Sequence, residues 1–531
     1  MRHSLRALAL IFLALVAGAG ARASAQEITG TITGTVVDQT GAPLPGAVVS
    51  ARHLEKGLSR EVATSKAGVY TLPFLTTGPY EVTVSLSGFK TFVAKNITIH
   101  VNDRLELNAT LGMQGVTESV EVTASAQLIQ QTPAVQNLMG ATQVQELPLN
   151  NRNFVQLATL VPGVSSDLSD EVGIGLTSTV SISINGGRRN AVNWLVDGAS
   201  NVDVGSNITL LSTPTVDSIE EFKIITSSYS AEWPRSGGGV VNVVTKSGSN
   251  VFRGTAYEFF RDDSMNSNAY FRKQSTNPDI ASKPPALDYH NFGYTLGGPI
   301  QKDKFFFFWS QEWRNISRAP TALTATVPDP TWLTDPANAN YVAPALRDPN
   351  AVRLLNAWPA PNLPGANRYI SNAPSDQDTR QEVLRLDYAL SSKWRLMARY
   401  THDLSKTVEA GGLFFGTAVP NVATTQTKVP GQVAVLQATT TINPTTLNEF
   451  TFQFSSNRIG TTNPDGTKNK RSDYSLNVPE VFGSNPGGII PTVAITGLTS
   501  IGSAQLYSIE YNNFTFSDNI SFVRGAHSIK A

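Results

Sequence analysis

The C-terminal half of the chain alternates apolar and polar residues over long segments, and this pattern restricts the folds open to it. Successive side chains of a β-strand point to opposite faces, so such segments have one apolar and one polar face. In two of them, Phe450, Phe452 and Phe454 alternate with Glu449, Thr451, Gln453 and Ser455, and Trp394, Leu396, Ala398 and Tyr400 alternate with Arg395, Met397, Arg399 and Thr401. Arginine and glutamate on the polar face are typical of a sheet with lipid on one side and water on the other.

The connections between the predicted strands alternate between long and short. We predict strands at 252–262, 288–300, 304–315, 380–391, 394–403, 431–442, 446–457 and 509–523, with a ninth beginning at Ser528. Short turns on one side and long loops on the other are the topology of outer-membrane barrels. Residues 251–531 are therefore predicted to form an antiparallel transmembrane β-barrel. An open sheet of eight strands leaves unpaired edges, which lipid does not tolerate, so we expect only the first part of a barrel here, C-terminally truncated.

The first 25 residues are predicted to be an export signal peptide. Arg2 and Arg6 precede an apolar run, Ala7 to Ala17, that is too short to span a bilayer. Ala23-Ser24-Ala25 matches the A-x-A cleavage pattern, so we expect Gln26 to be the mature N-terminus. A retained membrane anchor is the less favoured alternative.

The composition narrows the classes of function. The chain has no cysteine, which excludes thiol catalysis and Cys–zinc sites. Its 41 basic and 41 acidic residues balance, which argues against a nucleic-acid partner. The histidines are scattered over different predicted units, and no Ser/His/Asp or paired-carboxylate pattern is present. We therefore expect no enzyme, no catalytic residues, no cofactor and no metal site, although Asp262-Asp263 leaves calcium open.

Residues 28–112 are predicted to form a β-sandwich of seven strands. Alternating segments are separated by Gly- and Pro-rich turns at the spacing of sandwich domains. The segments Gly34-Thr35-Val36-Val37-Asp38, Gly41-Ala42-Pro43-Leu44-Pro45-Gly46-Ala47, Gly68-Val69-Tyr70, Gly78-Pro79-Tyr80 and Ser87-Gly88-Phe89 resemble the carboxypeptidase regulatory-like domain. That resemblance implies a carbohydrate-binding-like fold and no peptidase activity. A spacer role is favoured, and glycan binding stays open.

Residues 116–250 are predicted to be an α+β domain. Thr142 to Leu147 reads as a short helix, with Thr142 and Gln145 at capping-box spacing. Four segments resemble, in order, the plug of TonB-dependent receptors: Asn185-Gly186-Gly187-Arg188, Leu195-Val196-Asp197-Gly198, Ile219-Glu220-Glu221-Phe222-Lys223-Ile224 and Gly237-Gly238-Gly239-Val240-Val241-Asn242. The resemblance implies a compact plug in the barrel lumen. Arg188-Arg189 is expected to pair with wall carboxylates, with an anionic ligand as the alternative.

The barrel strands resemble the Oar-like branch of TonB-dependent transporters. The resemblance rests on Gly254-Thr255-Ala256-Tyr257-Glu258-Phe259-Phe260-Arg261, Asn291-Phe292-Gly293-Tyr294-Thr295-Leu296-Gly297-Gly298-Pro299-Ile300 and Lys304-Phe305-Phe306-Phe307-Phe308. It implies an outer-membrane receptor or transporter, surrounded by outer-membrane lipid, with its N-terminal domain in the periplasm. It also implies an extracellular ligand and, as partner, the TonB protein of an inner-membrane complex.

The TonB contact is expected between the sandwich and the plug. Glu118, Val120, Glu121 and Val122 are placed to add a strand to a partner's sheet, although an ordinary linker strand fits equally well. The alternative function is surface adhesion or carbohydrate binding without transport, by Trp332, Trp358 and Tyr341 of the longest loop. We favour packing of the loop for these aromatics. The substrate class, whether iron chelate, vitamin, glycan or peptide, stays open.

Overall fold

The computed structural model describes the chain from Thr29 onward, with gaps. The described residues are 29–113, 120–123, 129–130, 134–149, 152–166, 182–204, 210–229, 237–274, 278–319, 323–363, 367–371, 373–412, 419, 422–443, 446–479, 488–502, 506–524 and 527–531. The predicted export signal and Glu118 lie outside these ranges. Within them, no helix has the length and apolar character needed to cross a membrane.

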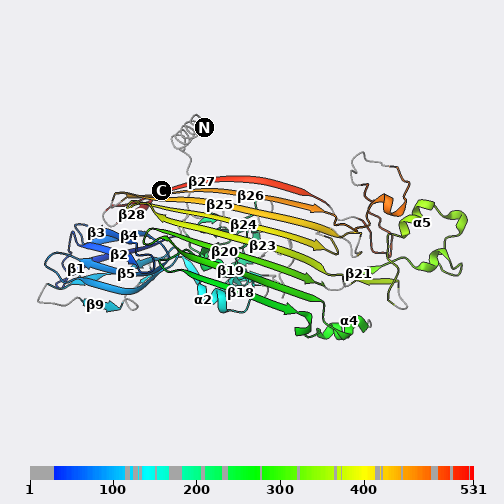
Figure 1. Cartoon of the computed structure of the whole chain (residues 1–531), viewed down its shortest axis with the longest axis horizontal. Helices are drawn as coiled ribbons and strands as arrows, with labels where there is room; N and C mark the ends of the chain where they lie inside the picture. Colours follow the sequence, from blue (N-terminus) through cyan, green and yellow to red (C-terminus); the bar gives the residue numbers. More distant parts are fainter. Residues whose placement is uncertain are drawn as a thin grey trace, which may run out of the picture.

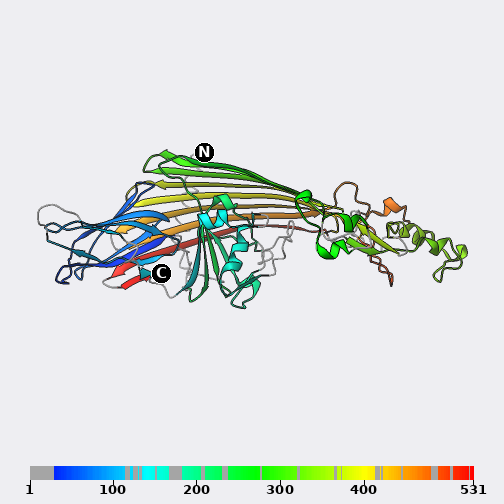
Figure 2. The same cartoon turned by 90° about the horizontal axis from the view of Figure 1, so that it is seen from below.

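Three parts follow one another along the chain: a sandwich, a plug and a long curved sheet. Figure 1 shows the sandwich, in blue, at one end of the long sheet, which runs from green to red. Figure 2 shows the plug, with helix α2 (Ala141–Glu146), on one face of that sheet. The predicted order of a β-sandwich, an α+β plug and an antiparallel barrel sheet, in a mostly β chain, is confirmed.

The sandwich consists of two five-stranded sheets around one apolar core. One sheet contains β10 (Ile129–Gln130), β7 (Arg104–Glu106), β1 (Gly30–Asp38) and β4 (Val69–Leu75), with β8 (Ala109–Leu111) also beside β1. The other contains β3 (Ser59–Ala63), β2 (Val48–His53), β5 (Gly78–Ser85), β6 (Phe92–Ile99) and β9 (Val120–Thr123). Leu72, Val82 and Ile97 are fully buried between the sheets. The alternation seen in the sequence thus places one face of each sheet in the core.

The strand count differs from the predicted seven. The stretch before Leu111 divides into β7 and β8 because Leu107 and Asn108 leave the regular ladder, and Asn108 Oδ1 instead accepts the N–H of Thr35 at 2.8 Å. The two sheets also include β9 and β10, which come from the segment between the predicted sandwich and the plug sheet. This segment is therefore part of the sandwich's hydrogen-bonded structure.

The plug is built on a five-stranded sheet. Its strand order is β11 (Val135–Gly140), β16 (Ile219–Ser227), β17 (Val240–Thr245), β14 (Asn193–Val196) and β15 (Ala199–Ser200), and β12 (Val164–Ser166) pairs with β13 (Ile182–Ile184) beside it. Every residue of β17 is buried. Val241 and Val243 belong to the plug's own core, whereas Val244 packs with Met397 and Val433 of the long sheet. The apolar run of β17 is therefore explained by burial on both faces.

The predicted helix of the plug is present but begins one residue earlier. It spans Ala141–Glu146, and Gln143 Oε1, not Gln145, accepts the backbone N–H of Gly140 at 3.1 Å. The predicted capping pair of Thr142 and Gln145 was therefore wrong by two residues. Only the glutamine half of a capping box is formed, because Gly140 has no side chain to accept a backbone N–H.

The long sheet contains nine antiparallel strands in sequence order. They are β18 (Arg253–Asp262), β19 (Leu287–Gln301), β20 (Phe305–Arg318), β23 (Ser375–Ala389), β24 (Trp394–Glu409), β25 (Thr425–Asn443), β26 (Thr446–Thr462), β27 (Ser508–Arg524) and β28 (His527–Lys530). Each predicted strand is observed, and most run further towards the long loops than the alternation indicated. Among the described residues β18 and β28 form the two edges, so this sheet is not closed into a barrel.

The two faces of the long sheet have the predicted characters. Phe514 and Phe516 are 63% and 53% exposed on the outer face, whereas Arg399 and Glu449 are 3% and 0% exposed on the face that meets the plug. Apolar side chains are thus exposed on the outer face, whereas polar side chains of the opposite face are buried on the side of the plug. This arrangement suits lipid outside and a hydrated lumen inside.

Connections of unequal length divide the sheet into two ends. The short turns, including 302–304 and 390–393, lie beside the sandwich at what we call the turn end (Figure 1). The opposite loop end carries α4 (Pro278–Ser282), β21 (Leu323–Thr326) and α5 (Pro349–Leu355) (Figure 1). Several loops there share an apolar core that includes Val327, Trp358 and Ile501. The loop end is therefore a packed structure in its described parts.

Candidate functional site at the plug–wall interface

Asp197 lies at the tip of a tight hairpin in the plug. Leu195 pairs with Ser200 and Val196 with Ala199, which leaves Asp197-Gly198 as a two-residue turn. Both turn residues have positive φ, 46° and 73°, as a type I′ hairpin turn requires. The Leu-Val-Asp-Gly segment of the sequence therefore folds so that one carboxylate projects from the edge of the plug.

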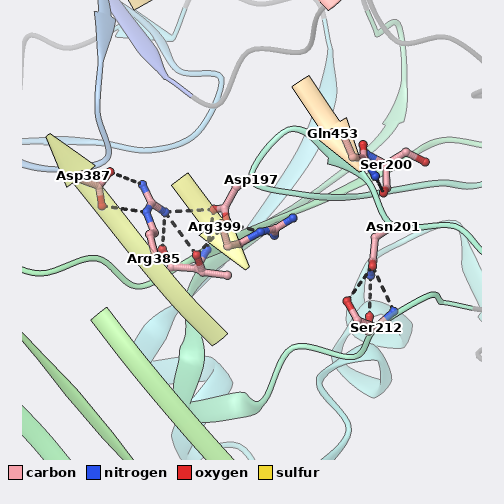
Figure 3. A network of polar contacts seen from close by, with 9 residues as sticks. Asp197, Ser200, Asn201, Ser212, Arg385, Asp387, Arg399 and Gln453 are labelled. Atoms are coloured by element: carbon pink, nitrogen blue, oxygen red, sulfur yellow. Dashed lines mark hydrogen bonds and ion pairs between the residues drawn. The ribbon is translucent and has the colours of Figure 1, made fainter. Parts of the chain in front are cut away.

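The Asp197 carboxylate is fully buried against the wall (Figure 3). Arg385 of β23 and Arg399 of β24 each donate to one of its oxygens, both at 3.1 Å. Thr245 at the end of β17 adds its backbone N–H at 2.9 Å and its hydroxyl at 2.7 Å. A buried carboxylate with this many donors is compensated for the loss of water.

Arg385 also connects the plug to a second carboxylate. Its Nε and one terminal nitrogen donate to the two oxygens of Asp387 at 3.0 and 3.1 Å (Figure 3). Its other terminal nitrogen donates to the carbonyl of Thr245 at 2.8 Å. Two guanidinium groups and two carboxylates thus form a neutral network. A neutral polar interface can be replaced by water more easily than an apolar core, because each group has an alternative partner in solvent.

The hairpin strand beyond Asp197 is held by a second wall contact. Gln453 of β26 accepts the N–H of Ser200 at 3.0 Å and donates to its carbonyl at 2.6 Å (Figure 3). The side-chain amide of Gln453 therefore makes the same pair of hydrogen bonds to Ser200 that the backbone of a neighbouring strand would make. Further along, Asn201 and Ser212 close the loop through three hydrogen bonds of 2.7 to 3.2 Å.

A third wall contact lies below this loop. Asp403 of β24 accepts the N–H of Thr213 at 2.7 Å, and Gln381 of β23 donates to the Thr213 carbonyl at 2.7 Å. These contacts, like the Ser200 pair, use the backbone of the plug and side chains of the wall. Their geometry thus fixes the plug's position while depending little on its side chains.

The glycine-containing segments found in the sequence meet each other. Gly238 donates its N–H to the carbonyl of Ala191 at 3.0 Å, and Gly239 accepts from Asn193 at 2.9 Å. A Cβ on Gly187 would lie 3.1 Å from the Cα of Gly238, and one on Gly239 would lie 2.7 Å from Ile184. Gly186 and Gly237 flank this contact. The glycines are therefore needed for close approach of two backbones.

The ion pair with the wall that was expected for Arg188 is not found among the described residues. The side chains of Arg188 and Arg189 are both exposed. The wall instead supplies the arginines and the plug supplies the carboxylate, Asp197. Plug and wall are joined by ion pairs, as predicted, but Arg188 is not the residue that forms them.

The sandwich contacts the plug through buried charges that the sequence did not single out. Lys223 of β16 donates to Asp103 at 2.9 Å, with only 2% of the lysine side chain exposed. Glu221, on the same strand, accepts the N–H of Val101 at 2.6 Å and binds His100 Nδ1 at 2.6 Å. Burial alone would lower the pKa of His100, but the hydrogen bond and charge of Glu221 raise it above its usual value. This contact therefore includes a titratable pair.

The predicted TonB-contact segment is partly visible. Val120, Glu121 and Val122 lie in β9, which pairs in parallel with β6 of the sandwich. Glu118 lies outside the described residues. Among the described strands β9 is the edge of its sheet, so we expect one of its sides to be open to a further strand.

Two other sequence predictions concern the loops. Trp358 is 5% exposed and donates its indole N–H to the carbonyl of Thr499 at 2.8 Å, which confirms that it packs the loop. Trp332 and Tyr341 are half-buried. Asp262 caps a short 3₁₀ turn through the N–H of Ser264 at 2.9 Å. No group of three or more metal-ligating acidic or histidine side chains is found in the described part of the chain.

Comparison with known sequence families gives two matches. Residues 244–531, more than half of the chain, match the family described as outer membrane beta barrel domain. Residues 31–112 match the carboxypeptidase regulatory-like domain. The two matches coincide with the long sheet and the sandwich.

Individual relatives cover only parts of the chain or are distant. The TonB-dependent transporter Oar of Myxococcus xanthus is 30% identical over 305 residues, which are 54% of this chain and 27% of that protein. The outer membrane transporter YddB of Escherichia coli aligns with a TM-score of 0.45 at 14% identity, over 74% of this chain and 47% of that one. The siderophore receptor PirA of Acinetobacter baumannii aligns with a TM-score of 0.42 at 12% identity, over 73% and 45%. The chain thus spans about a quarter of the curated relative and under half of these structures.

Proposed function

The chain belongs to the outer membrane beta barrel domain family, and from this we propose that it is part of a TonB-dependent receptor or transporter. The similarity to the transporter Oar over 305 residues supports this class. The observation that carries the proposal is the plug, held on the polar face of the barrel sheet by Asp197, whose charge together with that of Asp387 balances Arg385 and Arg399. Apart from the apolar cluster around Val244, Met397 and Val433, the plug is joined to its wall by hydrogen bonds and ion pairs, so it can move while exposing little apolar surface.

The orientation follows from the lengths of the connections. Short turns of outer-membrane barrels face the periplasm and long loops face the exterior. The sandwich lies at the turn end, so we place it in the periplasm, where an exported chain would meet a partner anchored in the inner membrane (Figure 1). The packed loop end then faces the extracellular ligand.

The partner contact is assigned to β9. Strand addition needs an extended segment with a free edge, and Val120, Glu121 and Val122 supply one in the periplasmic part. Because β9 already pairs with β6, TonB either adds beside β9 or takes it away from β6. Movement of this segment would then reach the plug through β10 and β11.

Binding of TonB can be measured without knowing the ligand. The full chain in neutral detergent micelles is titrated with the periplasmic domain of TonB, and a variant lacking residues 118–123 is the comparison. Saturable binding that the deletion abolishes supports the proposal. The adhesion alternative requires no such partner, so absence of binding by the intact chain would favour it.

A further inference from the structure

A pocket lies at the turn end, between the sandwich and two neighbouring turns of the barrel sheet. Its volume is about 430 Å³, within the range of roughly 300–1,000 Å³ typical of ligand sites. Lys302 and Lys304 come from the turn between β19 and β20, and Arg395 from the start of β24. Ser59, at the start of β3, closes the side formed by the sandwich. Two separate segments of the barrel sheet therefore bring three cations to one hollow.

The charges of this pocket are not balanced by its own residues. The side chains of Lys302 and Arg395 make no hydrogen bond or ion pair with any described residue. The ammonium nitrogen of Lys304 lies 5.8 Å from the centre of the Tyr388 ring. The one carboxylate in the lining, Asp303, accepts a hydrogen bond from Asn250 at 2.6 Å. The pocket thus presents more positive than negative charge, with hydrogen-bond donors unused.

A second, smaller cavity of about 60 Å³ lies directly behind Arg395. Lys56 of the sandwich faces it and is 5% exposed, together with Arg385 and Asp387 of the wall. Burial lowers the pKa of Lys56, and Arg385 and Arg395 act in the same direction against Asp387. Arg395 therefore lies between the pocket and a group of further charged side chains of the sandwich and the wall.

We propose that this pocket binds a phosphate group and so clamps the sandwich to the barrel rim. A planar guanidinium bonds two phosphate oxygens at once, and lysines supply further point charges. Trp394, next to Arg395 but on the opposite, outer face, is 43% exposed, which places the pocket near the level of lipid head groups. The phosphate source is either a phospholipid of the periplasmic leaflet or a soluble phosphate. The site is independent of TonB, so it can fail while the proposed function stands.

Calorimetry on the full chain in neutral detergent micelles tests this site with two probes. The probes are inorganic phosphate and a water-soluble short-chain phosphatidylglycerol. We expect saturable binding of at least one probe, weakened about tenfold by Arg395→Gln, since one charge-assisted contact is lost. Lys302→Gln, in an exposed turn that tolerates substitution, is expected to weaken binding severalfold. Lys283→Gln, an exposed lysine at the loop end, is the matched control and should change nothing.

The results distinguish the two sources of phosphate and also show whether the site binds phosphate at all. Binding of the lipid alone assigns the site to a head group, and binding of inorganic phosphate alone assigns it to a soluble ligand. If neither probe binds, the proposal is wrong. It is also wrong if the Arg395→Gln and Lys302→Gln variants both bind as tightly as Lys283→Gln.

Discussion

Arg385 and Arg399 are direct cross-strand partners on β23 and β24. Their side chains point to the same face, where like charges placed opposite each other destabilise a sheet. The carboxylate that lies between them belongs to the plug, since Asp197 accepts from both. The wall therefore depends on the plug for its charge balance at this point.

Removing the Asp197 charge is expected to loosen the plug. Asp197→Asn leaves the buried guanidinium of Arg399 without a counter-charge, while Arg385 keeps only Asp387, and the loss should cost about 3–5 kcal/mol. The free energy of unfolding of the full chain in micelles measures the loss. Asp376→Asn on the exposed end of β23, where the carboxylate contacts Ser317, should cost less than about 1 kcal/mol. Equal losses in the two variants would contradict the role of Asp197.

An arginine on the outer face should be costly only at mid-depth. Phe452, whose ring lies 5.1 Å from that of Phe516, is near the middle of its strand, and Phe452→Arg should cost about 2–4 kcal/mol in a bilayer. Leu404 lies on the same face, close to the loop end. The substitution Leu404→Arg should therefore reduce the stability by only about 0–1 kcal/mol. Refolding into vesicles measures both. A similar cost at the two sites would mean that this face does not meet lipid.

A disulfide across β6 and β9 should block the TonB contact if TonB takes β9 from the sandwich. Val93 and Glu121 are register partners, and the chain has no cysteine of its own. Oxidised Val93→Cys/Glu121→Cys is expected not to bind the periplasmic domain of TonB, and reduction should restore binding. The Ser50→Cys/Glu61→Cys pair, which joins β2 to β3, should bind in both states. Full binding by the oxidised first pair would show that TonB adds beside β9 instead.

The sandwich–plug contact should weaken as the pH rises. Glu221 raises the pKa of His100 above 6.5, so the charged pair contributes fully below that pH and is lost as the pH passes the raised pKa. The difference in melting temperature between the wild type and His100→Gln should therefore be largest near about pH 6 and shrink towards about pH 9. A difference that stays constant or grows with pH would contradict this.

The alternation of the barrel strands was sufficient to predict their order, faces and turns, because a period of two is imposed by lipid on one side and water on the other. The partners of Asp197 were not predictable. Arg385 and Arg399 lie 188 and 202 residues further along the chain, and a single sequence carries no signal that links such positions. Gln453 was recognised only as a polar-face residue, and its contact with Ser200 depends on where the plug docks. The charges of Glu221 and Lys223 are visible in the sequence, but their burial against the sandwich is not.

The segment between the sandwich and the plug contributes one strand to each sheet of the sandwich, since β9 pairs with β6 and β10 pairs with β7. A mechanical load applied at β9 would thus be borne first by the sandwich. Within the described residues two pairs hold β10, Ile129 with Glu106 and Gln130 with Leu105, so we expect this link to yield before tension along the chain reaches β11. The sandwich then takes up weak pulls on β9, and β10 must detach before the chain itself can pull on β11 of the plug.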